Sequence, residues 1–119
     1  MFKIGTLITA KHNNRKRYGA IDGIICGNRL GIVYSDSDGY TNALVNEDDI
    51  VEATGKDRDE AFKSALSYCN YIGESLNFNA ARIAQSKDMD EKEKEWNLAI
   101  IADNKKRVIL LLESLKSLI

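Results

Sequence analysis

Four side chains between residues 71 and 82 stand at spacings of four, three and four residues; they are Tyr71, Ser75, Phe78 and Arg82. On a helix this spacing places them in one column along a single face. An aromatic ring can stack on a nucleobase, and an arginine can bind a phosphate through two parallel hydrogen bonds. The column therefore predicts either a nucleotide-binding surface or a packing surface against the rest of the molecule or a second copy.

A second candidate is the basic segment 11–17, which holds four Lys or Arg residues together with His12. The segment is polar and has no periodic pattern, so we predict a loop. Such a cluster can bind phosphate or nucleic acid, and it can equally be a solvated loop without a ligand. No nucleophile motif accompanies His12, so the sequence does not indicate acid–base catalysis.

Other catalytic and metal chemistry lacks its residues. The chain contains neither of the glycine-rich phosphate-binding motifs, and its one histidine and two distant cysteines cannot build a zinc site of the usual spacing. Asp48 and Asp49 are adjacent, so on a strand they point to opposite faces. Segment 36–39 predicts a turn rather than a calcium loop, because the remaining ligand positions do not fit. We therefore expect a protein that is not an enzyme and holds no metal or cofactor.

The chain has 119 residues, a net charge of −1, 44% hydrophobic residues and 29% charged residues. These values are typical of one compact folded domain and do not predict binding to duplex DNA by charge alone. The start of the chain lacks the apolar region of a signal peptide, and no apolar run is long enough to cross a bilayer. We expect a cytoplasmic protein, in the host cytoplasm if a phage encodes it.

Residues 1–55 hold seven of the eight glycines and read as short strands separated by turns. We predict strands at 2–10, 18–26, 29–35, 40–45 and 49–52. Five short strands with tight turns predict an antiparallel sheet that closes, or half closes, into a small barrel. The pattern resembles SH3-like barrels of the KOW and Tudor type in segments 4–5, 18–21, 31–34, 38–39 and 47–50.

Residues 56–119 read as a hairpin of two long helices, at 56–87 and 91–119, each with an apolar stripe of helical period. Asn104 falls inside the stripe of the second helix, where a buried amide fixes the register between helices. Segment 108–112 is apolar all round, with Leu110 off the stripe. A helix that is apolar on two faces needs two partners, so we predict a homo-oligomer, a dimer or larger, through the hairpin. The sheet and the hairpin together form an α+β unit.

A five-strand antiparallel sheet followed by two helices in a short chain is similar to the phage anti-Thoeris sponges. These anti-defence proteins are small oligomers that sequester cyclic nucleotide immune signals between subunits. The resemblance implies a non-enzymatic protein that binds cyclic ADP-ribose isomers or cyclic oligonucleotides. It also implies that aromatic and arginine side chains near subunit contacts hold the ligand. The positions that could serve here are Phe78, Arg82 and Arg107, with Asn104 or Asn79 as amide partners.

A different function stays open. An SH3-like interaction module would bind nucleic acid or a host protein through the basic segment 11–17, and the hairpin would serve dimerisation. Arg29 and this segment are the alternative location of a ligand site if the helix column only packs.

Overall fold

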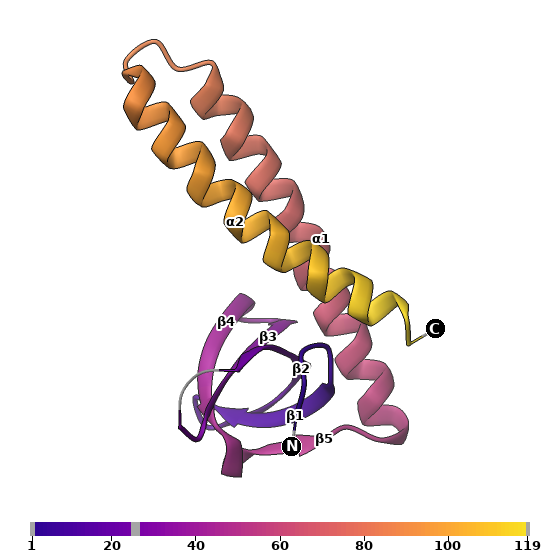
Figure 1. The fold of residues 1–119 in the computed structure, drawn as a ribbon. Coiled ribbons are helices and arrows are strands. Elements are labelled where there is room, and N and C mark those ends of the chain that lie inside the picture. Colours follow the sequence, from indigo (N-terminus) through magenta and orange to yellow (C-terminus); the bar gives the residue numbers. More distant parts are fainter. Residues whose placement is uncertain (1, 25–26, 119) are drawn as a thin grey trace.

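The computed structural model describes residues 2–24 and 27–118 and shows an antiparallel sheet followed by a long helical hairpin (Figure 1). The predicted α+β class is confirmed. The elements in chain order are β1 Leu7–His12, β2 Arg15–Ile24, β3 Arg29–Asp36, β4 Gly39–Asn46, a 3₁₀ turn Glu47–Asp49, β5 Ile50–Glu52, α1 Gly55–Ala84 and α2 Glu91–Lys116.

The five strands form one sheet in the order β4-β3-β2-β1-β5, and every pair is antiparallel. The sheet is strongly curved but open, with β4 and β5 at its two edges (Figure 1). Of the two predicted forms, a closed and a half-closed barrel, the closed one is therefore wrong in the described residues. β5 is three residues long and pairs only with β1, so it leaves β4 without a closing neighbour.

The predicted loop at 11–17 is wrong. Strands β1 and β2 continue through this segment, with Lys11 opposite Lys16 and His12 opposite Arg15. Asn13 and Asn14 form the two-residue turn between them, with φ of 52° and 62°. Asparagine tolerates this left-handed conformation better than most residues, and two such residues in succession suit the right-handed twist of a hairpin. The basic residues therefore stand on strands instead of on a loop.

The first strand begins later than predicted, at Leu7 instead of residue 2. Gly5 has a φ of 91°, and its N–H donates to the carbonyl oxygen of Ile21 at 2.8 Å. A Cβ atom at this position would lie 2.6 Å from Cβ of Ser114 on α2. Glycine is thus required here for both its backbone conformation and its size, and the turn that it makes delays the strand. The predicted strand end at Cys26 lies outside the described residues.

The sheet has a hydrophobic core on each of its two faces. Neighbouring residues on a strand point to opposite faces, so each strand can contribute to both cores. Leu7 belongs to the face that packs on the helices, in a core with Ala20, Val33, Ala53, Ala61, Ala65, Tyr68, Cys69, Leu111 and Leu115. Ile8 belongs to the face inside the curve of the sheet, in a second core with Ala10, Ile21, Leu30, Ile32, Tyr34, Val45 and Ile50. The first core joins the sheet and the hairpin into one packed unit.

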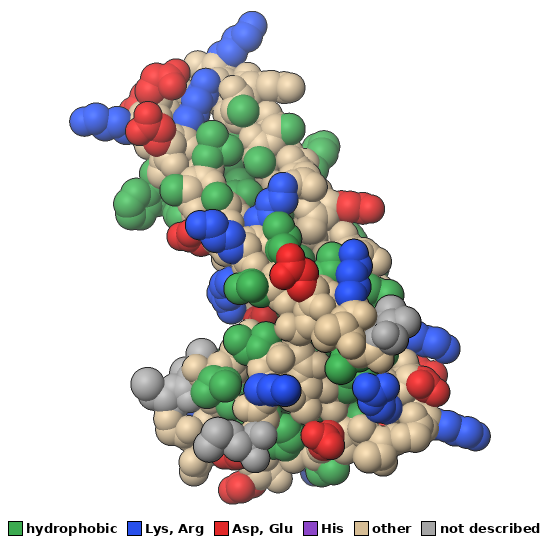
Figure 2. All heavy atoms as spheres, turned by 45° about the vertical axis from the view of Figure 1, so that its right-hand side comes forward, with side chains coloured by type: hydrophobic (Ala, Val, Ile, Leu, Met, Phe, Trp, Pro, Cys, Tyr) green, Lys and Arg blue, Asp and Glu red, His purple; other side chains and the backbone are tan. Residues whose placement is uncertain are grey.

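The two helices are long, with 30 residues in α1 and 26 in α2. The side chain of Asp90 caps α2 by accepting a hydrogen bond from the Glu93 N–H at 2.8 Å, whereas the residue at the N-cap of α1, Thr54, makes no such side-chain bond. The hairpin crosses the sheet near one end and projects well beyond it (Figure 1). In Figure 2 apolar side chains reach the surface along this projection, between charged ones. Within the described residues, the helices are not apolar enough over a sufficient length to cross a membrane.

Candidate functional site

A pocket of about 200 Å³ lies where β2 and β4 meet both helices. We call it the junction pocket. Five of its lining side chains carry hydrogen-bonding groups, and four are apolar; the polar ones are Asp22, Asn42, Tyr68, Asn104 and Arg107, and the apolar ones are Ile72, Leu76, Val108 and Leu111. Four elements that are far apart in the sequence therefore supply one mixed site.

Asp22 is the charged residue inside this pocket. The register of β2 against β3 shifts between Ile21 and Gly23, so Asp22 lies at an irregularity of the kind that redirects a side chain. Its carboxylate is 9% exposed and accepts a hydrogen bond from Nδ2 of Asn42 at 3.3 Å. Nη2 of Arg107 donates to the same oxygen, Oδ2, at 3.3 Å.

The electrostatics of the pocket follow from this burial. Burial raises the pKa of the Asp22 carboxyl above its ordinary value, while the charge of Arg107 and the hydrogen bonds from Asn42 and Arg107 lower it by a smaller amount. Burial also raises the pKa of the Tyr68 hydroxyl, and the charge of Asp22 adds to the shift. A carboxylate that is costly to bury is thus held open to a pocket, an arrangement that is found more often at binding sites than in ordinary cores.

Arg107 and Asn104 are the two predicted site residues that the structure brings together. Arg107 is 58% exposed at the rim of the pocket, and an arginine has five N–H donors, so its contact with Asp22 leaves donors for an anion. Asn104 is exposed, and its predicted burial between the helices is wrong within this chain. The buried side chains of α2, Leu111 and Leu115, lie further along the same stripe, where the helix packs in the core with the sheet.

The remaining predicted residues lie elsewhere. Phe78 is 68% exposed on the face of α1 opposite its apolar stripe, and Arg82 is exposed one turn further along. Asn79 is half-buried on the same helix, and Arg29 is exposed at the start of β3. One chain therefore does not gather the predicted ligand-binding residues into one site.

The helix column of Tyr71, Ser75, Phe78 and Arg82 has two different parts. The Tyr71 ring stacks on the Tyr40 ring of β4, with centroids 3.9 Å apart and planes at 2°. This part of the column is packing between helix and sheet. Phe78 and Arg82 lie on the projecting part of α1, beyond that contact, and stay open to solvent.

The sequence analysis missed Asp22, Asn42 and Tyr68. Asp22 had a signal, because it is a carboxylate between Ile21 and Gly23 in the otherwise uncharged segment 18–24 of β2. Asn42 and Tyr68 had none, since an asparagine on an edge strand and a tyrosine in a helix stripe are both ordinary.

The segment 11–17, considered as a nucleic-acid surface, is largely neutralised. The Arg17 side chain is 3% exposed and contacts Asp36 at 2.6 Å and Asp38 at 2.8 Å. Arg15 also contacts Asp38, and Lys16 contacts Asp57. His12 shares a 2.8 Å hydrogen bond with the Tyr34 hydroxyl. Three of the four cations are thus paired, Arg15 and Arg17 within the sheet and Lys16 with α1, which disfavours the interaction-module hypothesis in the form that uses this segment.

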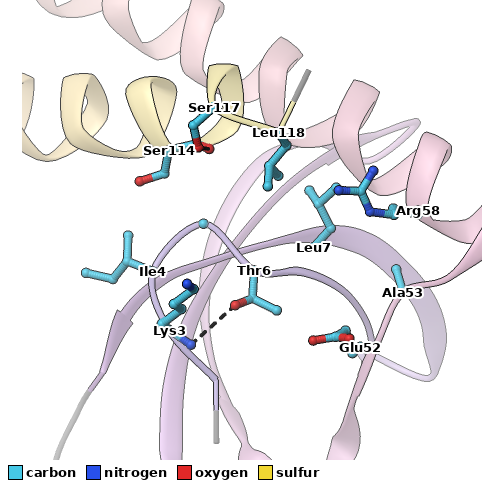
Figure 3. A pocket seen from close by; sticks show the side chains of 11 residues that line it. Lys3, Ile4, Thr6, Leu7, Glu52, Ala53, Arg58, Ser114, Ser117 and Leu118 are labelled. Atoms are coloured by element: carbon cyan, nitrogen blue, oxygen red, sulfur yellow. Dashed lines mark hydrogen bonds between the residues drawn. The ribbon is translucent and has the colours of Figure 1, made fainter.

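A larger hollow, of about 480 Å³, lies between the N-terminal turn, the link from β5 to α1 and the end of α2 (Figure 3). Lys3, Thr6 and Glu52 line one side, Arg58 lines another, and Leu118 points into the hollow from the segment after α2. The Lys3 N–H donates to Oγ1 of Thr6 at 3.3 Å. None of the predicted site residues lies in this hollow, so Arg58 offers a matched control for Arg107.

Neither metal nor thiol chemistry gains support from the geometry. Over residues 2–24 and 27–118, acidic, histidine and cysteine side chains do not gather in groups of three that could hold a metal ion. Cys69 is 2% exposed, and burial raises the pKa of its thiol to about 11, so it behaves as a small apolar side chain. Cys26 lies outside the described residues.

The comparisons with known proteins add little. A scan against protein-family models finds no match, and a search of curated proteins finds no match. Among solved structures, the crystal structure of kinase-associated protein B from Bacillus cereus aligns with 89% of this chain and 96% of its own, at 13% identity and a TM-score of 0.40. A likeness at this level carries no argument about function.

Proposed function

We propose that this protein is a non-enzymatic binding protein that sequesters a cyclic nucleotide signal at the junction pocket, in the manner of the phage anti-Thoeris sponges. The observation that carries the proposal is the convergence of Asp22, Asn42, Asn104 and Arg107, from β2, β4 and α2, on one pocket. Two of these residues, Asn104 and Arg107, are also positions that the family resemblance implies for ligand binding. The proposed place of action is the cytoplasm.

The chemistry of the pocket suits parts of a nucleotide. The buried Asp22 carboxylate accepts hydrogen bonds from ribose hydroxyls or from the N–H groups of a base. The half-exposed Arg107 binds a phosphate, and the Asn104 amide both donates and accepts. Ile72 and Leu76 form an apolar wall for a ring. These groups bind and orient a ligand without a nucleophile or a free base to transform it.

The size of the pocket supports a site that is completed by a second copy. Ligand pockets commonly measure about 300–1,000 Å³, so a pocket of about 200 Å³ holds part of a cyclic dinucleotide. On α2, Leu110 is 59% exposed and Ile109 is 43% exposed, which leaves an apolar surface for association. We propose that the chain associates through this surface of the hairpin, so that Phe78 and Arg82 of another copy can approach the ligand.

The test compares two arginines in two different hollows. The protein is screened by thermal shift against cyclic dinucleotides, cyclic trinucleotides and cyclic ADP-ribose isomers, with a short DNA duplex alongside, and hits are measured by isothermal titration calorimetry. Arg107→Gln is expected to weaken binding at least about tenfold, which requires about 1.4 kcal/mol. Arg58→Gln, in the hollow of Figure 3, is expected to leave the affinity unchanged.

Three outcomes would contradict the proposal. The first is the absence of any nucleotide hit. The second is binding of DNA in place of nucleotides. The third is a nucleotide whose affinity falls with Arg58→Gln and not with Arg107→Gln, which would move the site to the larger hollow.

A further inference from the structure

The free edge of β4 is unusual because nothing in its sequence protects it. β4 lies at one end of the sheet order and pairs with β3 on one side, and no other described strand pairs with it. It is eight residues long and contains no charged residue and no proline. Proteins usually protect such an edge with charge, proline, a bulge or a very short strand. The opposite edge, β5, follows this rule, with three residues that include Glu52.

The hairpin turn determines which backbone groups of β4 face outward. Asp36 pairs with Gly39 across a two-residue turn, and this register continues to Arg29 opposite Asn46 without a shift. A two-residue turn closes on a hydrogen-bonded pair, and hydrogen-bonded pairs then alternate along an antiparallel ladder. The N–H and C=O groups of Tyr40, Asn42, Leu44 and Asn46 therefore point away from β3, toward the open edge.

We propose that β4 pairs with β4 of a second copy of this chain, antiparallel and across a two-fold axis, so that two five-stranded sheets become one of ten strands. Residues directly opposite each other in a ladder must lie on the same face of the sheet. In a strand paired with its own reversed copy, the two opposite positions must therefore differ by an even number of residues. The two-fold axis then passes through one residue and not between two residues. With Asn42 on the axis, Tyr40 lies opposite Leu44 of the second copy on the face that bears the helices.

The strand suits a second copy because it is complementary to itself. A neutral strand brings no like charges directly opposite each other when it meets its own reversed copy. Tyr40 is 44% exposed and Leu44 is 54% exposed, and each would cover the other across the axis. The stack of Tyr40 on Tyr71 already fixes the tyrosine ring, so pairing orders little that is mobile.

The pairing also places a second chain beside the junction pocket. Asn42 lines the pocket and contacts Asp22, while its backbone faces the open edge. Across a hydrogen-bonded pair the two Asn42 Cα atoms would lie about 5.5 Å apart. The second copy thus adds an amide at the pocket rim. Only this consequence rests on the proposed function; the pairing itself is independent of any ligand.

The test removes one N–H group that faces the open edge of β4 and leaves every hydrogen bond between β4 and β3 in place. Leu44→Pro lacks the donor at the free edge, and Leu44→Thr is the matched control that shortens the side chain and keeps the donor. Masses are measured without nucleotide, by light scattering after size exclusion over a range of micromolar concentrations. Circular dichroism confirms that each variant is folded. For the wild type and Leu44→Thr we expect a concentration-dependent mass that reaches at least twice the 13.3 kDa of one chain.

For Leu44→Pro we expect a smaller mass than that of the wild type, because only the association through α2 remains. For Leu44→Pro combined with Leu110→Asp we expect the mass of one chain. Hydrogen exchange supplies a second measurement, with slow exchange of the Asn42 and Leu44 amides in the wild type at high concentration and fast exchange on dilution. If Leu44→Pro does not fold, Leu44→Lys is used instead, because it places a charge on the edge and keeps the donor; it should dissociate the pair.

Two results would overturn the inference. One is a single-chain mass for the wild type at every concentration. The other is an oligomer that the folded edge variant, Leu44→Pro or Leu44→Lys, leaves intact. If such an oligomer dissociates with Leu110→Asp, association uses α2 alone, and nucleotide binding remains a separate measurement.

Discussion

Asp22→Asn separates what Asp22 does for the fold from what it does for a ligand. The side chain keeps its size and its position at the irregularity of β2, and the amide oxygen can still accept from Asn42 or Arg107. Only the buried negative charge is lost. We expect this substitution to leave the stability unchanged or to raise it, and to lower the affinity for a nucleotide at least about tenfold.

The magnitude follows from two opposing contributions. The partner, Arg107, is 58% exposed, and an ion pair with so open a partner contributes about 0–1 kcal/mol. The carboxylate itself is 9% exposed, and the desolvation of a buried charge can exceed what its partner returns. The raised pKa of the Asp22 carboxyl shows the same balance, since burial is the largest cause of its shift. We therefore expect a gain of zero to about 1 kcal/mol in the free energy of unfolding at pH 7.

The dependence on pH has a definite sign. A carboxyl whose folded-state pKa is raised above its ordinary 3.8 makes the folded state less stable once it is ionised. This penalty disappears as the pH falls through the raised pKa toward 3.8. The advantage of Asp22→Asn over the wild type should therefore be largest near neutral pH and should shrink in acid.

The assay is urea unfolding followed by circular dichroism at several pH values, with calorimetry for the ligand. Asp38→Asn is the matched control. Arg17 donates to Asp38 and lowers the pKa of that carboxyl, so the same substitution there should reduce stability at pH 7. A loss of more than about 2 kcal/mol for Asp22→Asn would refute the reasoning, because it would mean that the ion pair outweighs the desolvation.

Three further predictions use single positions. Leu110→Asp should reduce the sedimentation mass, whereas Lys106→Asp, an exposed position on the same helix, should not; equal masses for both variants and the wild type would remove α2 as an interface. Phe78→Ala and Arg82→Ala should keep the thermal midpoint, since both side chains are exposed, and should each weaken nucleotide binding measured by calorimetry; a lowered midpoint would identify them as packing residues. Arg17→Ser should lower the midpoint much more than Arg15→Ser, because Arg17 is enclosed and contacts Asp36, Asp38 and the His12 carbonyl; equal effects would contradict this.

The sequence predicts the order of elements well, and it fails where an interaction between distant segments decides the outcome. The helix starts follow from apolar periodicity, which is local. The continuation of β1 and β2 through 11–17 depends on the pairing of Lys11 with Lys16 and on Arg17 reaching Asp36 and Asp38, which are supplied by another hairpin. A polar run therefore looks like a loop until its partners are known.

The openness of the sheet has a similar cause. Whether a meander closes depends on the length of its last strand, and β5 ends at Glu52, three residues before α1 begins at Gly55. The predicted strand, 49–52, is one residue longer than β5. A sequence pattern does not distinguish a strand of three residues from one of four. In the structure β5 is too short to reach β4, and the edge of β4 stays open.

The candidate site shows why charged residues in apolar strands are informative. Phe78 and Arg82 attract attention because helical spacing makes them a column, yet spacing within one element cannot show what lies opposite. Asp22 is the charged residue in the second part of its strand, segment 18–24, and a buried charge there is tolerated only where another element supplies compensation. Here Arg107 comes from a helix 85 residues away in the sequence, and Asn42 comes from the edge strand. Both partners leave the Asp22 carboxylate beside the junction pocket. Asp22, a charge at a buried strand position, therefore indicates the site better than the spacing of Phe78 and Arg82 does.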